Sequence, residues 1–187
     1  MIELGVLVLA ALGLALRTCL SLIFAAAGVS KLRDPAIFER AVAGYRLLPG
    51  VLVAPVAMVL PFLELAIAGA LWIEPLRPAG AAAAVALLLL FATAMEINIR
   101  RGRTQIDCGC GSGFASQAIS RLLVLRNGVL AGTAALVLAA PDGLGGLALA
   151  NCLVAGLLLF GLHILVDLVL ALIARPTRST RSAWNIQ

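Results

Sequence analysis

The amino-acid sequence predicts an all-α fold: a polytopic transmembrane helix bundle of about five spans with one interfacial amphipathic helix. Of the 187 residues, 63% are hydrophobic and 12% are charged, whereas soluble domains have about 45–50% apolar and about 25% charged residues. The apolar residues come in long runs, which is typical of helices that cross a bilayer. The polar connections are short, so residues 1–187 are expected to form a single membrane domain.

Each of the five predicted spans holds about 20 or more mostly apolar residues, the length that a helix needs to cross the hydrocarbon core. These segments must be helical because lipid offers no hydrogen-bond partner to a free backbone amide. Small residues recur within them, as in Ala81–Ala84 and in Gly128 with Gly132, and favour close approach between helices. The predicted spans are residues 5–29, 51–73, 78–99, 119–140 and 147–174.

The connection between the first two spans contains an amphipathic segment. Asp34 and Pro35 provide an N-cap followed by a first-turn proline. Apolar residues then recur at helical spacing, which predicts a helix over residues 35–47 that lies along the membrane interface. Two segments remain: the loop over residues 100–118 and the C-terminal tail over residues 175–187.

Basic residues are distributed unequally between the two ends of the predicted bundle. Arg77 alone lies at one end, and ten lysines and arginines lie at the other. By the positive-inside rule, the basic end faces the cytoplasm. The formal net charge of +5 is therefore attributed to the cytoplasmic face of a membrane protein, whose partner is the lipid bilayer. It does not indicate a nucleic-acid interface. The ten are Lys31, Arg33, Arg40, Arg46, Arg100, Arg101, Arg103, Arg175, Arg178 and Arg181.

Two cysteines separated by one glycine, Cys108 and Cys110, lie in the loop over residues 100–118. A disulfide between them closes a very small ring, which should be strained and easily reduced. Strained disulfides tend to be catalytic or regulatory, so this pair is the candidate catalytic site. Two thiolates could instead bind a soft metal ion such as copper(I), and a third reading is that both are inert loop thiols.

Neighbouring residues in the loop are expected to support the cysteine pair. Arg103 favours the thiolate form, whereas the adjacent Asp107 opposes it. Gly109 removes side-chain bulk and lets the backbone turn between the two cysteines. Cys19, near the middle of the first span, could act as a relay only if the loop dips inward; buried cysteines are usually packing residues.

Ionisable residues within the predicted spans are costly and need partners or a function. Arg17 and Glu64 lie mid-span in the first two helices, and equal depth predicts that they form an ion pair. Arg126, Asp167 and His163 lie near the basic end of the last two spans. Both groups can be interpreted as internal ion pairs that hold the bundle together, or as a polar cavity that accepts a quinone or relays protons.

Four short motifs are distributed over most of the chain: Gly28–Pro35, Phe38 with Tyr45–Pro49, Pro61–Glu64, and Arg103 with Asp107–Cys110. In this order they resemble the motifs of the methylamine utilisation protein MauE, a family within the wider DoxX-like membrane proteins. Their order and spacing are more specific than any single motif.

The resemblance implies a multi-pass protein of the bacterial inner membrane that is associated with redox maturation. Such proteins are linked to producing the disulfide-rich small subunit of methylamine dehydrogenase in the periplasm, beside a thioredoxin-like partner. The family is also similar to the four-helix core of vitamin K epoxide reductase, which passes electrons from thiols to a quinone. Cys108 and Cys110 would then be the exchanging pair.

This chain departs from the family pattern after the cysteine pair, where Gly111 and Ser112 replace an aromatic residue and a glycine. It also lacks a second cysteine pair. Periplasmic work needs access from outside, whereas the charge distribution places the loop at the cytoplasmic face. Thiol–disulfide exchange is the leading hypothesis, with soft-metal transport through Cys108 and Cys110, or a membrane scaffold without chemistry, as alternatives.

Overall fold

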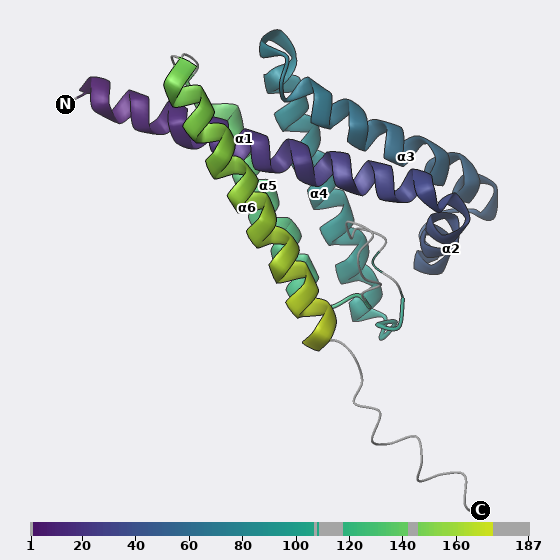
Figure 1. Ribbon diagram of the computed structural model, residues 1–187. Coiled ribbons are helices and arrows are strands. Elements are labelled where there is room, and N and C mark those ends of the chain that lie inside the picture. The colour runs from purple at the N-terminus through teal and green to yellow at the C-terminus, as the bar shows by residue number, and fades with distance from the viewer. Residues whose placement is uncertain (1, 107, 109–117, 142–145, 174–187) are drawn as a thin grey trace, which may run out of the picture.

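A computed structural model describes residues 2–106, 108, 118–141 and 146–173 of the protein. In this part of the chain all the regular elements are helices (Figure 1). Five of them are long and apolar enough to cross a membrane, so the predicted all-α, multi-pass fold is confirmed. The elements are α1 (Ile2–Arg33), α2 (Pro35–Tyr45), α3 (Gly50–Ala70), the 3-10 turn η1 (Glu74–Leu76), α4 (Arg77–Arg100), α5 (Arg121–Ala139) and α6 (Gly146–Ile173).

The helix ends differ from the predicted spans in ways that matter for the site. Helix α1 continues to Arg33, so that Lys31 belongs to its last turn and not to a loop. Helix α3 ends at Ala70, because the chain turns into η1 before the proline at the start of α4. Helix α5 begins at Arg121, where the Ser120 hydroxyl accepts a hydrogen bond from the Leu123 amide at 3.4 Å.

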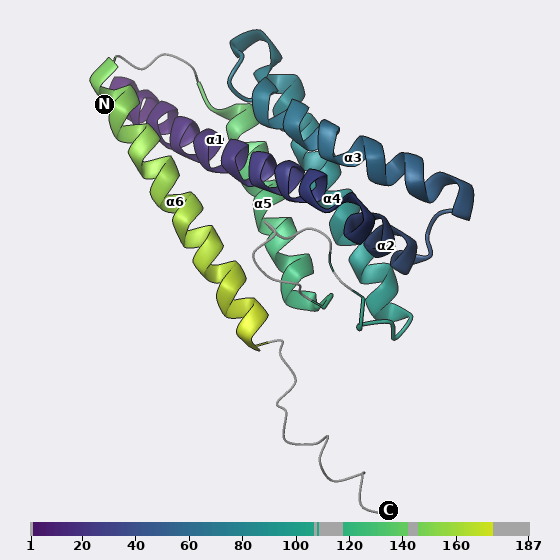
Figure 2. The ribbon, with the colours of Figure 1, turned by 45° about the vertical axis from the view of Figure 1, so that its right-hand side comes forward.

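Four of the helices form a closed ring around the main hydrophobic core. Helix α1 packs against α3, α3 against α4, α4 against α5, and α5 back against α1. Buried residues from all four meet in one cluster, including Leu20, Ile67, Leu87 and Ala134. Helix α6 lies outside this ring and packs along α1 (Figure 2). The arrangement is therefore a four-helix core with one additional spanning helix on its outside.

Small residues set some of the helix contacts, although not all of those expected. A Cβ atom on Gly28 of α1 would lie 2.9 Å from the Pro61 carbonyl oxygen of α3, so glycine is required for this close approach. Ala81 and Ala84 are fully buried in the core. Gly128 and Gly132 were expected to serve the same purpose, but space is open beside both among the described residues.

The short helix α2 covers the end of the bundle where α3 begins and α4 ends (Figure 1). Asp34 occupies its N-cap position and Pro35 its first turn. It buries Phe38 and Ala41 and is amphipathic, as the sequence predicts. The helix ends at Tyr45 because Arg46 adopts a left-handed conformation with φ of 48°.

Candidate functional site

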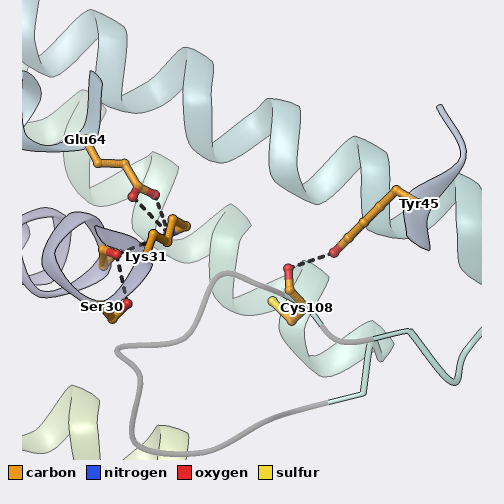
Figure 3. A network of polar contacts seen from close by, with 6 residues as sticks. Ser30, Lys31, Tyr45, Glu64 and Cys108 are labelled. Carbon is orange, nitrogen blue, oxygen red and sulfur yellow. Dashed lines mark hydrogen bonds and ion pairs between the residues drawn. The ribbon is translucent and has the colours of Figure 1, made fainter. Parts of the chain in front are cut away.

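A hydrogen bond to its backbone carbonyl connects the first cysteine of the predicted pair to the end of α2. Cys108 is buried, and its carbonyl oxygen accepts a hydrogen bond from the Tyr45 hydroxyl at 2.9 Å (Figure 3). Tyr45 is the last residue of α2. The end of the amphipathic helix therefore fixes the position of the cysteine backbone, although the two residues are 63 positions apart in the sequence.

Arg103 links the same helix end to α4. Its guanidinium donates to the carbonyl oxygens of Gly44 at 2.7 Å and Tyr45 at 3.3 Å, and to Oδ1 of Asn98 at 3.2 Å. These carbonyls have no partner within α2 because they lie in its last turn, and a cation is favourable there. Asn98 is fully buried. Arg103 thus holds the beginning of the cysteine loop between α2 and the end of α4.

An apolar cavity of about 310 Å³ lies beside Cys108. The Cys108 sulfur is 3.8 Å from the sulfur of Met95, a fully buried residue of α4. The cavity can accept an apolar group in contact with the cysteine, but it offers little hydrogen bonding. Its lining comes from α2, α3, α4 and the connections that follow α2 and α4, and includes Phe38, Tyr45, Leu48, Leu60 and Phe91.

The rest of the predicted exchange loop lies outside the described residues. This applies to Asp107, Gly109 and Cys110. The structure therefore positions Cys108 and Arg103 only, and the chemistry of the pair stays a prediction.

The intramembrane ion pair predicted between Arg17 and Glu64 is wrong. Glu64 binds Lys31 instead, with Nζ 2.8 Å from Oε1 and 2.9 Å from Oε2 (Figure 3). The Lys31 ammonium also lies 5.3 Å from the centre of the Phe38 ring. Arg17 stacks over the Trp72 ring at 5.3 Å and lies 4.0 Å from Glu74.

The register between α1 and α3 explains this error. Gly28 lies opposite Pro61 and Leu65, and the Ser21 hydroxyl donates to the Ala68 carbonyl at 2.9 Å. Arg17 therefore lies level with the turn that follows α3, and not with its middle. Side chains on a helix point toward its N-terminus, so the long Lys31 chain extends back along α1 to reach Glu64.

Arg126, Asp167 and His163 come together between α5 and α6. Nη1 of Arg126 donates to Oδ1 of Asp167, and Nε2 of His163 lies 3.6 Å from Oδ2 of the same carboxylate. Arg126 and His163 line a second cavity, of about 420 Å³, bounded by α1, α5 and α6. Cys19 lines this second cavity too, whereas Cys108 lines the first, so the described residues do not bring these two cysteines together.

Several residues around Cys108 and Glu64 were not assigned to a site from the sequence. Lys31 was counted only as part of the basic end, and Tyr45 only as part of the amphipathic helix. Met95 carried no signal, because a buried methionine in a span is unremarkable. Lys31, Glu64, Tyr45 and Arg103 nevertheless belong to the four motifs that carry the family resemblance. Membership in these motifs was the signal in the sequence that could have identified these residues.

Comparison with known proteins identifies the family. The family model of the methylamine utilisation protein MauE matches residues 9–140. The methylamine utilization protein MauE of Paracoccus versutus is 45% identical over 165 residues, which cover 86% of this chain and 88% of the relative. That of Paracoccus denitrificans is 45% identical over 131 residues, covering 70% of this chain and 68% of the relative.

The similarity is higher but shorter for the MauE protein of Methylophilus methylotrophus, which is 51% identical over 61 residues. These cover 33% of this chain, and the chain spans about a third (32%) of that relative. No solved structure matches the chain. The family model covers α1 from residue 9 onward and continues to the end of α5, and it includes every residue placed around Cys108 and Glu64. The chain therefore belongs to the MauE family of methylamine utilisation proteins.

Proposed function

We propose that this protein performs or supports thiol–disulfide exchange through Cys108 and Cys110, in the inner membrane, during methylamine utilisation. The observation that carries the proposal is the anchoring of Cys108. Its backbone is held by Tyr45, its loop by Arg103, and its sulfur lies among buried residues next to an apolar cavity. Tyr45 and Arg103, which make these contacts, both belong to the motifs that carry the family resemblance, and this gives further support. A loop cysteine without a function would not require these contacts.

The exchange conserves electrons between the cysteine pair and a dithiol or disulfide of a partner. A thiolate of the pair attacks a partner disulfide, forms a mixed disulfide and expels one partner thiolate. The second cysteine then attacks its neighbour, closes the Cys108–Cys110 ring and releases the partner as a dithiol. The reverse sequence oxidises the partner. By family resemblance, the partner is a thioredoxin-like protein and the client is a disulfide-rich subunit of methylamine dehydrogenase.

We infer that the two cysteines have different roles in the exchange. Cys108 is 5% exposed, so a protein partner cannot reach its sulfur directly. We assign the first contact with the partner to Cys110 and the resolving attack to Cys108. With Cys108→Ser the mixed disulfide cannot be resolved, so a partner stays covalently attached to Cys110. With Cys110→Ser no such adduct accumulates.

Two measurements test this function. The Cys108→Ser/Cys110→Ser double variant should lose correct client disulfides, whereas Cys152→Ser, which removes a buried cysteine of α6, should not. If the client disulfides form normally in the double variant, thiol exchange is excluded and only a scaffold role remains. Labelling of Cys110 in intact cells with a membrane-impermeant maleimide distinguishes a periplasmic loop from the cytoplasmic one that the charge distribution predicts.

A second candidate function is soft-metal binding, and one contact favours it. The thioether of Met95 lies 3.8 Å from the Cys108 sulfur, and thioether and thiolate ligands together select copper(I). The reduced protein would then retain about one copper(I) ion per chain, and Met95→Leu would lower its affinity. Protein that stays metal-free in micromolar copper(I) excludes this candidate.

A further inference from the structure

We propose that the cavity between α1, α5 and α6 binds the head of a lipid-soluble molecule that carries a neutral carbonyl group. Cys108 does not line this cavity, and the inference does not depend on thiol exchange. It rests on the shape of the cavity, on its access from the bilayer, and on one buried arginine.

The cavity exists because α5 and α6 do not pack along each other. Helix α6 packs along α1, and the ion pair between Arg126 and Asp167 connects it to α5. The space of about 420 Å³ left beside this pair is open and not enclosed. The residues at its edge, Leu125, Val129 and Leu162, are exposed. In a multi-pass membrane protein such residues face lipid, so a molecule dissolved in the bilayer can enter from the side.

Arg126, which lines the cavity, has a hydrogen-bond donor that lacks an acceptor among the described residues. The Arg126 side chain is 10% exposed, and its bond to Asp167 uses one of the five N–H donors of a guanidinium. Its Nε is buried and has no acceptor among the described residues. A buried donor without an acceptor is destabilising, because the hydration that it loses is not replaced. A carbonyl oxygen in the cavity would give this guanidinium a further acceptor.

The charges of the cluster indicate a neutral head and not an anionic one. Asp167 balances Arg126, and His163 lies 3.6 Å from the same carboxylate. A second carboxylate or a phosphate would have to lie beside Asp167 in a medium of low dielectric, where like charges repel strongly. A ketone, ester or quinone oxygen accepts the same hydrogen bonds without that repulsion.

The depth of the cluster agrees with this ligand. Arg126 is five residues from the start of α5, and Asp167 is six residues from the end of α6. At 1.5 Å per residue, both lie about 7–9 Å inside the helix ends. A lipid-soluble molecule whose carbonyl head lies at this depth has its apolar tail in the hydrocarbon core. Two sources fit this chemistry: the ester carbonyl of a phospholipid, and the ring of a membrane quinone.

The test uses the full-length protein in nanodiscs of ether phospholipid, which lacks ester carbonyls. An alkyl benzoquinone with a diazirine on its tail is photo-crosslinked, and labelled peptides are mapped by mass spectrometry. Label is expected on the parts of α5 and α6 that line the cavity. Excess unlabelled alkyl benzoquinone that displaces the probe identifies a quinone site, and displacement by a diester phospholipid alone identifies a structural lipid. Equal displacement by an alkane overturns the proposal, because the head is then not recognised.

Three variants make the test specific. Leu159→Trp fills the cavity, and Leu158→Trp makes the same change at an exposed residue of α6 that does not line it. Arg126→Leu/Asp167→Leu removes both charges together and avoids a single unpaired charge. Labelling should fall about tenfold in Leu159→Trp and in the double variant, and should stay unchanged in Leu158→Trp. Unchanged labelling in the first two variants, with monodisperse protein, would overturn the proposal.

Discussion

The described part of the chain contains two buried ion pairs between a basic and an acidic side chain, and their surroundings differ. In the first, the Lys31 ammonium contacts both oxygens of Glu64 and the Phe38 ring, and the two side chains are 3% and 2% exposed. In the second, Arg126 makes one bond to Asp167, the side chains are 10% and 9% exposed, and a cavity lies beside them.

The difference separates an ion pair that holds helices together from one that can bind a ligand. A buried charge is tolerated where its partner and hydrogen bonds satisfy it. Lys31 and Glu64 meet this condition within the chain, and they join α1 to α3 next to the α2 residue Phe38. Arg126 does not, because its Nε has no acceptor among the described residues. The first two of the four predictions below test this contrast directly, and the other two test contacts near the first pair.

The largest effect is expected when the Lys31–Glu64 pair is broken on one side. Glu64→Gln should lower the free energy of unfolding by about 3–5 kcal/mol, because it leaves the Lys31 charge buried without a carboxylate. The double variant Lys31→Met/Glu64→Met should recover most of this loss. Unfolding by denaturant in mixed micelles measures both. A double variant as unstable as the single one would show that the pair is not the cause.

Breaking the second pair should cost less. Asp167→Asn and Glu64→Gln both leave an amide oxygen that can accept a hydrogen bond, but only Arg126 lies beside an open cavity, through which other groups can approach its guanidinium. We expect a loss of about 1.5–3 kcal/mol in the same unfolding measurement. If Asp167→Asn were as destabilising as Glu64→Gln, the two pairs would be equally structural and the contrast would fail.

The close contact of α1 with α3, beside the first pair, gives a third prediction. Gly28→Ala places a methyl group 2.9 Å from the Pro61 carbonyl oxygen, so the helices must move apart. The expected loss of stability is about 1–3 kcal/mol. Gly128→Ala is the matched control, since space is open there, and alanine favours a helix by about 1 kcal/mol over glycine. Equal losses at both positions would contradict the packing described for α1 and α3.

The smallest effect concerns the anchoring of Cys108. Tyr45→Phe keeps the ring in the cavity but removes the hydrogen bond to the Cys108 carbonyl, which contributes about 1 kcal/mol. Stability should change little, whereas alkylation of Cys108 should become several-fold faster as the loop opens more often. The alkylation of Cys152 in the same sample serves as the internal control. An unchanged rate at Cys108 would show that Tyr45 does not restrain the loop.

The sequence predicts the helices and their number well, since run length and hydrophobicity decide whether a segment can cross a bilayer. It also brings Arg126, His163 and Asp167 into one group, because helical spacing and a short connection between two spans leave few other arrangements. The prediction for Arg17 and Glu64 failed because it compared depth within each span. The true pairing depends on the register between α1 and α3, which the contact at Gly28 sets.

The surroundings of Cys108 could not be derived from periodicity. They depend on how α2 folds back over the bundle, and this depends on tertiary contacts such as the bonds from Arg103 to the end of that helix. An amphipathic pattern indicates that a helix has an apolar face but not which residues that face covers. The family motifs contained part of this information, because Tyr45 and Arg103 belong to them.

Helix α6 follows α5 in the chain, and it packs on α1 from outside the ring. The ring of α1, α3, α4 and α5 is complete in residues that precede it. Biosynthesis can therefore yield an assembled core while α6 is still being translated. When α6 then packs against α1, Asp167 pairs with Arg126 of the assembled core, and the lipid-facing cavity forms beside this pair.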